Sequence, residues 1–455
     1  RSRMPSAASS ASNASAAATV PAILSSVVDE QQRSLLHYAA YGGHFEVLRF
    51  LMDKSIANPK ARDRNDLSAL AMAGMARERK CLELLVQAEA DYSRAGPLNM
   101  TPLHWACWVG SDKLVQELIG RGVSVHELNA NDMSALHFAC AAHPVRSVQL
   151  LLQAGTSLET TDRHGNSAVH VAALANNDRA LGAILEHCKA ASADAAAFAS
   201  LARTSNSTGA TPLHAACLAG SVSCAAILAP YSDVLAVDQD GNTALIKAVC
   251  GGSVSIGVLP AKYHLWGGDR SADGSATGDG ADGVSARAAA YKLARGNAAD
   301  AVGEWGDDDD DDDRTSHSRR ELVELLVREH PLSVTHTNYR GESAAHYAAL
   351  KGDGGALWAL VAATKRTVDA ALSGDARHSA EQATFRALFS TATTSKAENC
   401  LHIAARCGYA SLLITMLELL SASDAATLLE LPNGAGLSPL QVACTHSRAE
   451  CARAL

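Results

Sequence analysis

The clearest pattern of apolar and polar positions in this sequence predicts a pair of short helices. Thr101 can cap the first helix, and Pro102 fits its first turn, where no N–H is needed. Leu103 and Ala106 fall on the face that points inward, and Gly110 can end the helix. A second helix is indicated by apolar residues at helical spacing, namely Leu114, Val115, Leu118 and Ile119.

The same pattern recurs with a period near 33 residues. Its motif is a small hydroxyl residue, a small residue, Leu, His, any residue and Ala, and it is complete in residues 101–106 and 211–216. Weaker copies begin at Ser34, Ser68, Ser134, Ser167, Thr243, Ser343, Asn399 and Ser438. Turn-forming residues precede the copies, and their Gly supplies a positive φ. One helix pair cannot bury its apolar faces alone, so neighbouring copies are expected to stack.

On these motifs the chain resembles the ankyrin-repeat family, whose unit is a β-turn followed by two antiparallel helices with a T-P-L-H-x-A signature. The resemblance covers about Asp29 to Leu455 and about ten copies. It implies an all-α solenoid of stacked helix-turn-helix pairs with β-turn or hairpin loops, interrupted by long insertions.

The spacing of the copies predicts the domain organisation. Residues 1–28 form a Ser/Ala-rich leader that is disordered or a partial cap, and residues 29–252 hold repeats 1–7. The array continues in residues 319–361 and 398–455. The pattern stops in the middle of a second helix, so the last repeat is expected to be truncated and the chain to be an excerpt of a longer one.

Three interruptions separate the copies. About eleven extra residues within 187–209 are expected to form a loop extension. Residues 253–318 are rich in Gly and Asp and poor in apolar residues, which favours disorder. Decayed repeats are the competing interpretation there, because the 100-residue spacing is close to three periods. Residues 362–397 form the last insertion, with helix expected around 381–389. We also expect the part after the acidic insertion to unfold independently.

Composition and charge narrow the class of protein. Ala recurs at the sixth motif position, which indicates close helix packing. The net charge is −9, and seven acids lie in one run from Asp307 to Asp313, so the chain lacks the basic footprint of a nucleic-acid binder. We expect that run to be solvated or to contact a basic partner. No stretch has the roughly 18–20 apolar residues of a membrane span. Eleven cysteines without a C-x-x-C pair favour a reducing compartment, cytoplasmic or nuclear.

Candidate chemistry is sparse. One His per repeat lies too far from the next for the ligands that zinc holds within about 2 Å, so the seven motif His residues are expected to bond adjacent turns. The Cys residues after the recurring Ala are expected to be small buried residues, namely Cys107, Cys140, Cys217 and Cys444. The turn beginning at Asp238 resembles half a calcium loop, but turn chemistry accounts for it. We therefore expect no enzyme activity, no cofactor and no metal in this chain.

The resemblance implies that partners bind the concave surface, which is made of turn tips and the ends of the first helices. Carried over repeat by repeat, the helix positions are Tyr41, Met75, Trp108, Val109, Leu174 and Leu218. The expected turn tips are Leu67, Met100, Met133, Arg163, His164 and Tyr339. We predict a monomeric scaffold that binds a protein or peptide in a groove centred on Trp108. The alternative is a targeting region of a larger enzyme, such as an acyltransferase or kinase, or of a channel.

Overall fold

The computed structural model describes residues 27–54, 56–88, 98–142, 144–191, 195–251, 312–371 and 375–455. The expected leader, except residues 27 and 28, lies outside them. The chain divides into two compact units. Unit 1 is Arg1–Ala168 with Gly182–Ala191, and unit 2 is Val169–Leu181 with Ser192–Leu455. No helix of the described residues is both long and apolar enough to cross a membrane.

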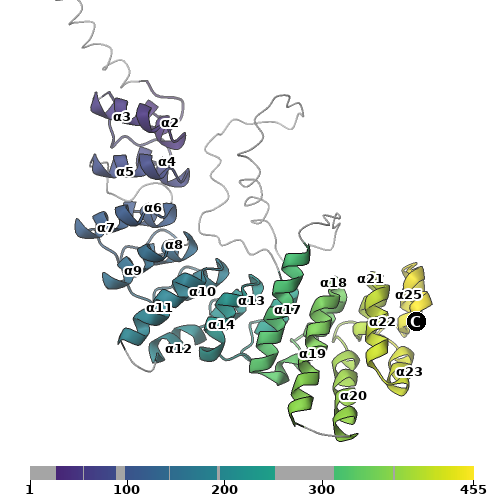
Figure 1. Cartoon of the computed structure of the whole chain (residues 1–455). Coiled ribbons are helices and arrows are strands. Elements are labelled where there is room, and N and C mark those ends of the chain that lie inside the picture. The colour runs from purple at the N-terminus through teal and green to yellow at the C-terminus, as the bar shows by residue number, and fades with distance from the viewer. Residues whose placement is uncertain are drawn as a thin grey trace, which may run out of the picture. The chain divides into compact units, whose positions relative to one another are not determined.

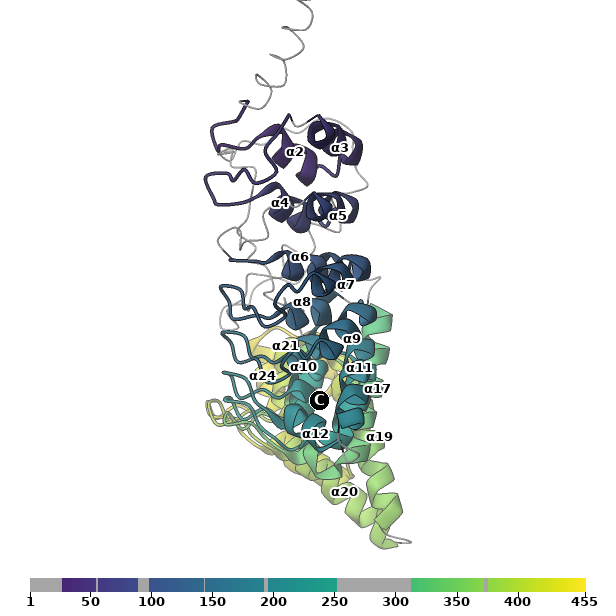
Figure 2. The ribbon, with the colours of Figure 1, turned by 90° about the vertical axis from the view of Figure 1, so that its left-hand side faces the viewer.

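Unit 1 is a stack of helix pairs (Figure 1). Its first helices are α2 (Leu35–Tyr41), α4 (Ala69–Met75), α6 (Pro102–Val109) and α8 (Ala135–Ala142). Its second helices are α3 (Phe45–Asp53), α5 (Arg79–Gln87), α7 (Asp112–Gly120) and α9 (Val145–Gln153). Consecutive first helices pack on one another. Figure 2 shows that the turns of this unit project to one side of the first helices, away from the second helices.

Two helices contain the division between the units, α10 (Ala168–Leu174) and α11 (Asp178–Ala191). For the extra residues within 187–209 the sequence predicts a loop extension, and this prediction is wrong. They lengthen α11 to 14 residues and form α12 (Ala196–Arg203). The reason is that this segment is Ala-rich and has its own apolar face, with Phe198 and Leu201 buried.

Unit 2 is built from helix pairs of the same kind, and two of its second helices, α17 and α19, are much longer (Figure 1). It contains α13 (Pro212–Leu218), α14 (Val222–Leu228), η1 (Ala229–Tyr231), α15 (Ala244–Cys250), α17 (Asp312–Glu329), η2 (Pro331–Thr335), α18 (Ala344–Lys351) and α19 (Gly354–Ala371). It ends with α20 (Asp375–Ser390), α21 (Cys400–Cys407), α22 (Ala410–Leu419), α23 (Ala422–Glu430), α24 (Pro439–Thr445) and α25 (Ala449–Ala454).

The two copies that flank the longest interruption are direct neighbours. Helix α15 packs on α18, and α17 completes the pair of α15. In the turns, the backbone N–H of Tyr339 donates to the carbonyl of Asp240 (3.1 Å). No helix pair of the described residues is therefore stacked between these repeats. Residues 252–311, on which the expected disordered insertion and the alternative of decayed repeats mostly fall, lie outside the described ones.

In two of the expected interruptions the structure has helices where the sequence predicts insertions. Residues 312–318, expected to be disordered, form the first turns of α17. Low apolar content does not exclude a helix whose buried face begins later, at Leu322. Residues 362–371 continue α19, and most of the remaining insertion is α20, which buries Phe385 and Phe389 against the stack.

Small residues make the close packing of the first helices possible. The Ala that recurs at the sixth motif position is at most 4% exposed in every copy. Its members are Ala39, Ala73, Ala106, Ala139, Ala172, Ala216, Ala248, Ala348, Ala404 and Ala443. A larger side chain would force the helices of adjacent repeats apart, so the packing of the repeats explains the Ala-rich composition.

The turns share one geometry. Asp238 accepts hydrogen bonds at Oδ1 from the backbone N–H groups of Asp240 (3.0 Å) and Asn242 (2.8 Å). This Asx turn accounts for the resemblance to a calcium loop. Gly241 has φ +79°, and a Cβ there would lie 2.8 Å from the backbone N of Tyr339. Only glycine allows the next turn to approach so closely.

Candidate functional site

The candidate site is the row of residues at the C-terminal ends of the first helices. In unit 1, Tyr41, Met75, Trp108 and Val109 are half-buried, so each presents part of its side chain to solvent. In unit 2, Leu174 and Leu218 are also half-buried at the equivalent positions of α10 and α13. The row predicted from the sequence is thus at the surface in each unit.

The expectation that Leu67, Met100 and Met133 are exposed turn tips is wrong. Their side chains are at most 3% exposed. Each residue directly precedes the residue that caps a first helix, where the chain has turned back toward the core. The carbonyls of Leu67 and Met133 accept hydrogen bonds from His37 and His104 of the preceding repeats, at 3.1 Å each. These three positions belong to the core and not to the site.

In the repeats that begin at Ser68, Ser167, Thr243 and Ser343, the exposed tips lie three and four residues before the capping hydroxyl. Arg163, His164 and Tyr339 occupy these positions and are exposed, Tyr339 to 70%. The same offset identifies tips that the sequence analysis did not name, Arg64, Asn65, Gln239 and Asp240, all exposed. The offset from Ser or Thr was available in the sequence and would have found them.

Trp108 lies between two other side chains of unit 1. Its ring meets Phe138 edge to face, with the ring centroids 6.3 Å apart. The guanidinium carbon of Arg77 lies 4.0 Å from the Trp108 ring centroid. The indole N–H is buried and has no hydrogen-bond acceptor among the described residues. Such an unsatisfied donor costs folding free energy, so packing of the ring face and edge must hold Trp108 in place.

The sequence analysis did not indicate Arg77 as a site residue. It lies nine residues after the capping Ser68, in the left-handed conformation with φ 58°. Glycine takes the equivalent position and conformation in five other repeats, at Gly43, Gly110, Gly220, Gly352 and Gly408. Aligning the copies with one another would have shown Arg77 as an exception, because it stands where most repeats have Gly.

The motif histidines link successive repeats, as predicted. In each copy Nε2 lies 3.0–3.1 Å from a backbone carbonyl of the following repeat. The seven residues are His37, His104, His137, His170, His214, His346 and His402. At His214, Nδ1 faces the backbone N–H of Thr211 (3.2 Å), so Nδ1 is the acceptor and Nε2 carries the proton.

Of the four cysteines that follow the recurring Ala, three are packing residues. Cys107, Cys140 and Cys217 are fully buried, and burial raises the pKa of each thiol, that of Cys140 to about 12. A thiol with so high a pKa is a poor nucleophile at neutral pH. Cys444, which was also expected to be buried, is exposed.

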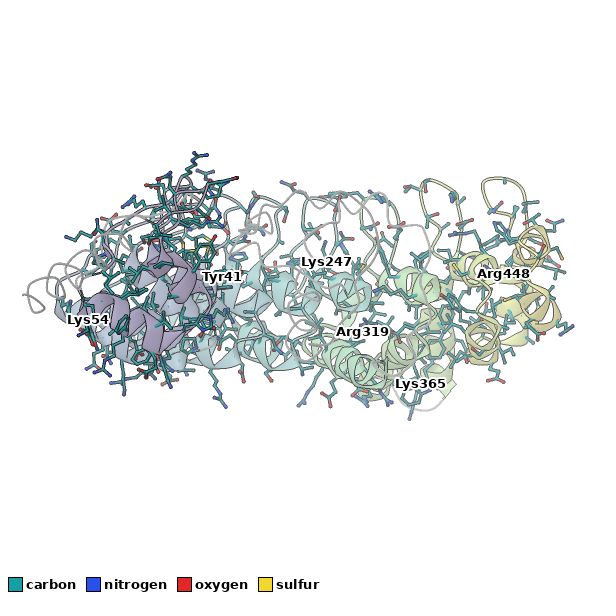
Figure 3. The ribbon with its side chains drawn as sticks, turned by 90° about the horizontal axis from the view of Figure 1, so that it is seen from above. Tyr41, Lys54, Lys247, Arg319, Lys365 and Arg448 are labelled. Atoms are coloured by element: carbon teal, nitrogen blue, oxygen red, sulfur yellow. The ribbon has the colours of Figure 1, made fainter. Side chains whose placement is uncertain are left out.

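Unit 2 carries cations beside the C-terminal ends of two of its first helices, α15 and α21. Nζ of Lys351 donates to the carbonyl of Gly251 at the end of α15 (2.9 Å), and Nε of Arg448 donates to the carbonyl of Arg406 near the end of α21 (3.3 Å). Figure 3 shows Lys247 and Arg448 on the side of the first helices. Helix C-termini attract cations, so local helix-end interactions account for Lys351 and Arg448.

Comparison with known proteins agrees with this geometry. The family model of ankyrin repeats matches residues 8–96, 103–196 and 188–257, which together are more than half of the chain. A putative E3 ubiquitin-protein ligase, XBAT31 of Arabidopsis thaliana, is 29% identical over 108 residues. The match covers 24% of this chain and 24% of the relative, so the chain spans only a quarter of the relative it matches.

Proposed function

This chain belongs to the ankyrin-repeat family, a family of protein-binding modules, and on that premise we propose that it is a non-catalytic scaffold. It binds a protein or peptide partner at the first-helix row of unit 1. The observation that carries the proposal is the half-buried Trp108, which shares the end of its helix with Val109 and follows Met75 of the preceding repeat. Trp is among the commonest residue types at the energetic centres of protein interfaces.

The setting of Trp108 supports this role. A ring held on one edge by Phe138 and covered on one face by Arg77 loses little side-chain freedom when a partner binds. Rigid apolar surface of this kind is typical of binding sites. In this proposal the scaffold acts as a monomer in a reducing compartment, the cytoplasm or nucleus. The acidic run from Asp307 to Asp313 is a second proposed contact, for a basic partner, and most of it lies outside the described residues.

The test is capture of partners from a lysate by the 455-residue chain and its variants. Trp108→Asp and Met75→Asp are expected to abolish capture, because each places a charge in the apolar row. Trp358→Asp is the matched control, since Trp358 is 50% exposed but lies on α19, a second helix. Circular dichroism must show that all three variants stay folded. Unchanged capture by folded Trp108→Asp protein would refute the site.

A second candidate function is the substrate-recognition region of a larger enzyme. The observation that favours it is the local similarity to a putative ubiquitin ligase. The experiment is to read the coding sequence on both sides of the present chain and to test the full product for transfer of ubiquitin to the captured partner. A partner that is captured but never modified would favour the scaffold alone.

A further inference from the structure

Arg77 is an exposed cation with no carboxylate partner in the described part of the chain. The neighbouring acid, Glu78, does not neutralise it, because its carboxylate lies against Gly43 of the preceding repeat. Arg77 faces the opposite way, onto Trp108 of the following repeat. The apolar row of unit 1 therefore contains a positive charge that is held by an aromatic ring alone.

The backbone at this position makes a purely structural role for Arg77 a poor explanation. A left-handed residue at a helix end is usually Gly, and a side chain there adds strain. Five other repeats use Gly in the same place, and two use a small polar residue, Asn176 or Ser447, so Arg77 is the long charged side chain among them. The cation–π contact recovers part of the cost, but Trp108 would pack on Phe138 without it. Arg77 thus places a guanidinium at the centre of the row in spite of the backbone strain.

The geometry leaves that guanidinium ready for a ligand. The guanidinium carbon of Arg77 lies over the ring of Trp108, and the residue as a whole is exposed, so N–H donors of Arg77 can be reached from solvent. A planar fork of N–H donors matches a carboxylate, which accepts two parallel hydrogen bonds. Met75 precedes Arg77 in the sequence and Trp108 follows it, and both offer apolar surface. A ligand that satisfies both features has a carboxylate next to an apolar side chain.

We infer that Met75, Arg77 and Trp108 bind an acidic–apolar peptide segment, in which an Asp or Glu lies beside a large apolar residue. This rests on the proposed function and names the chemistry of its partner. The apolar residue contacts Met75 and the exposed edge of Trp108, and the carboxylate accepts hydrogen bonds from Arg77. A phosphate backbone is the other possible anion, but the net charge of −9 opposes nucleic acid.

The experiment selects random 12-residue peptides, displayed on phage, against the full chain. Peptides with Asp or Glu beside Leu, Phe, Trp or Met are expected to be enriched. Arg77→Gln is expected to weaken their binding at least about tenfold, which is the loss of one charge-assisted contact. Arg79→Gln is the matched control: it makes the same charge change on α5, where Arg79 pairs with Glu83 at 3.4 Å.

A second variant separates binding from structure. Arg77→Gly removes the strained side chain, so it is expected to weaken peptide binding as much as Arg77→Gln without lowering the melting temperature. A fall in melting temperature that accounts for the lost binding would show a structural role and overturn the inference.

The outcomes distinguish this inference from the proposed function. Selected peptides that depend on Trp108 but lack acidic residues, and that bind Arg77→Gln unchanged, leave the proposed function standing and overturn the carboxylate site. Displacement of the peptides by single-stranded DNA at equal potency in wild type and Arg79→Gln would favour a phosphate ligand and also overturn it. Failure to select any peptide dependent on Trp108 would count against both.

Discussion

At the residue scale, the side chain at the fourth motif position stabilises both its own helix and the contact with the next repeat. His214 accepts a hydrogen bond from the cap of its own helix and donates one to the carbonyl of Asn242 in the next repeat, at 3.0 Å. In the last copy Gln441 takes this place, and its Oε1 accepts the cap N–H of Ser438 at 2.8 Å. The cap bond needs only an acceptor, whereas the bond to the next repeat needs the reach and the second nitrogen of His.

The buried histidines predict a loss of stability in mild acid. Burial lowers the pKa of His37, His137, His214, His346 and His402 below the usual 6.5. The unfolded chain therefore binds more protons, and the free energy of unfolding falls as pH drops through about 6.5. Each histidine contributes at most about 1.4 kcal/mol per pH unit. Urea unfolding at pH 7.5, 6.5 and 5.5 measures this.

His214→Gln is the matched test, since the chain itself uses Gln at this position. We expect it to cost about 0.5–1.5 kcal/mol at pH 7.5 through the lost bond to Asn242, and to reduce the dependence on pH. The exposed His126 is the control, and His126→Gln should change neither. A pH dependence that is identical in His214→Gln and wild type would contradict the argument.

At the element scale, the helix pair of α15 and α17 tolerates a long insertion because both helices contact their neighbours directly. Helix α15 packs on α18, and α17 packs on α14 and α19. These contacts are made by the helices themselves. The repeat thus needs α17 itself, but not the length of chain that leads to it.

This predicts that residues 253–311 are dispensable for folding. The end of α15 lies beside Arg319 of α17, because a Cβ at Gly251 would lie 2.9 Å from Nε of Arg319. Residue 312 lies about 10 Å farther along α17. A ten-residue Gly/Ser linker spans about 17 Å and can therefore connect the end of α15 to the start of α17. Because the closed loop becomes several-fold shorter, the free energy of unfolding should rise by about 1.5 kcal/mol. Urea unfolding measures the change. A marked loss of stability would show that the insertion itself packs on the repeats.

At the scale of the whole molecule, the division into units differs from the one expected. The sequence predicts that the part after the acidic insertion unfolds independently, and this stays a prediction; the contacts within the structure divide the chain near Ala168. The two sides of the insertion share helix packing and a side-chain bond, in which Nδ2 of Asn338 donates to Oδ1 of Asn242 at 3.0 Å. These residues are 96 positions apart in the sequence and adjacent in the fold.

Asn338→Ala is therefore expected to destabilise both sides of the insertion together. It removes the bond to Asn242 and the Asx turn whose Oδ1 accepts the N–H groups of Arg340 and Glu342. Hydrogen exchange followed by mass spectrometry should show protection falling in α15 as well as in α18, by about 1–3 kcal/mol. Exchange that accelerates in α18 alone would restore the insertion as a boundary.

Much of the fold is determined by the sequence alone, because its signals act within a few residues. The capping hydroxyl, Pro at the first turn and Gly at the helix end predict α6 and α13 closely. The recurring Ala and His are identified by period, and their burial and bonding follow from the stacking of identical units. The half-buried row at Tyr41, Met75 and Trp108 follows from the same register.

Only the tertiary structure decided which side chains form the site. Burial of Met100 and Met133 depends on where the chain turns back to the core, and the contact of Arg77 with Trp108 joins two repeats. The stacking of α15 on α18 brings together segments separated by a long insertion. Local propensities act within one turn of the chain, whereas these features depend on contacts between residues about 30 to 100 positions apart, whose geometry exists only after the repeats have stacked.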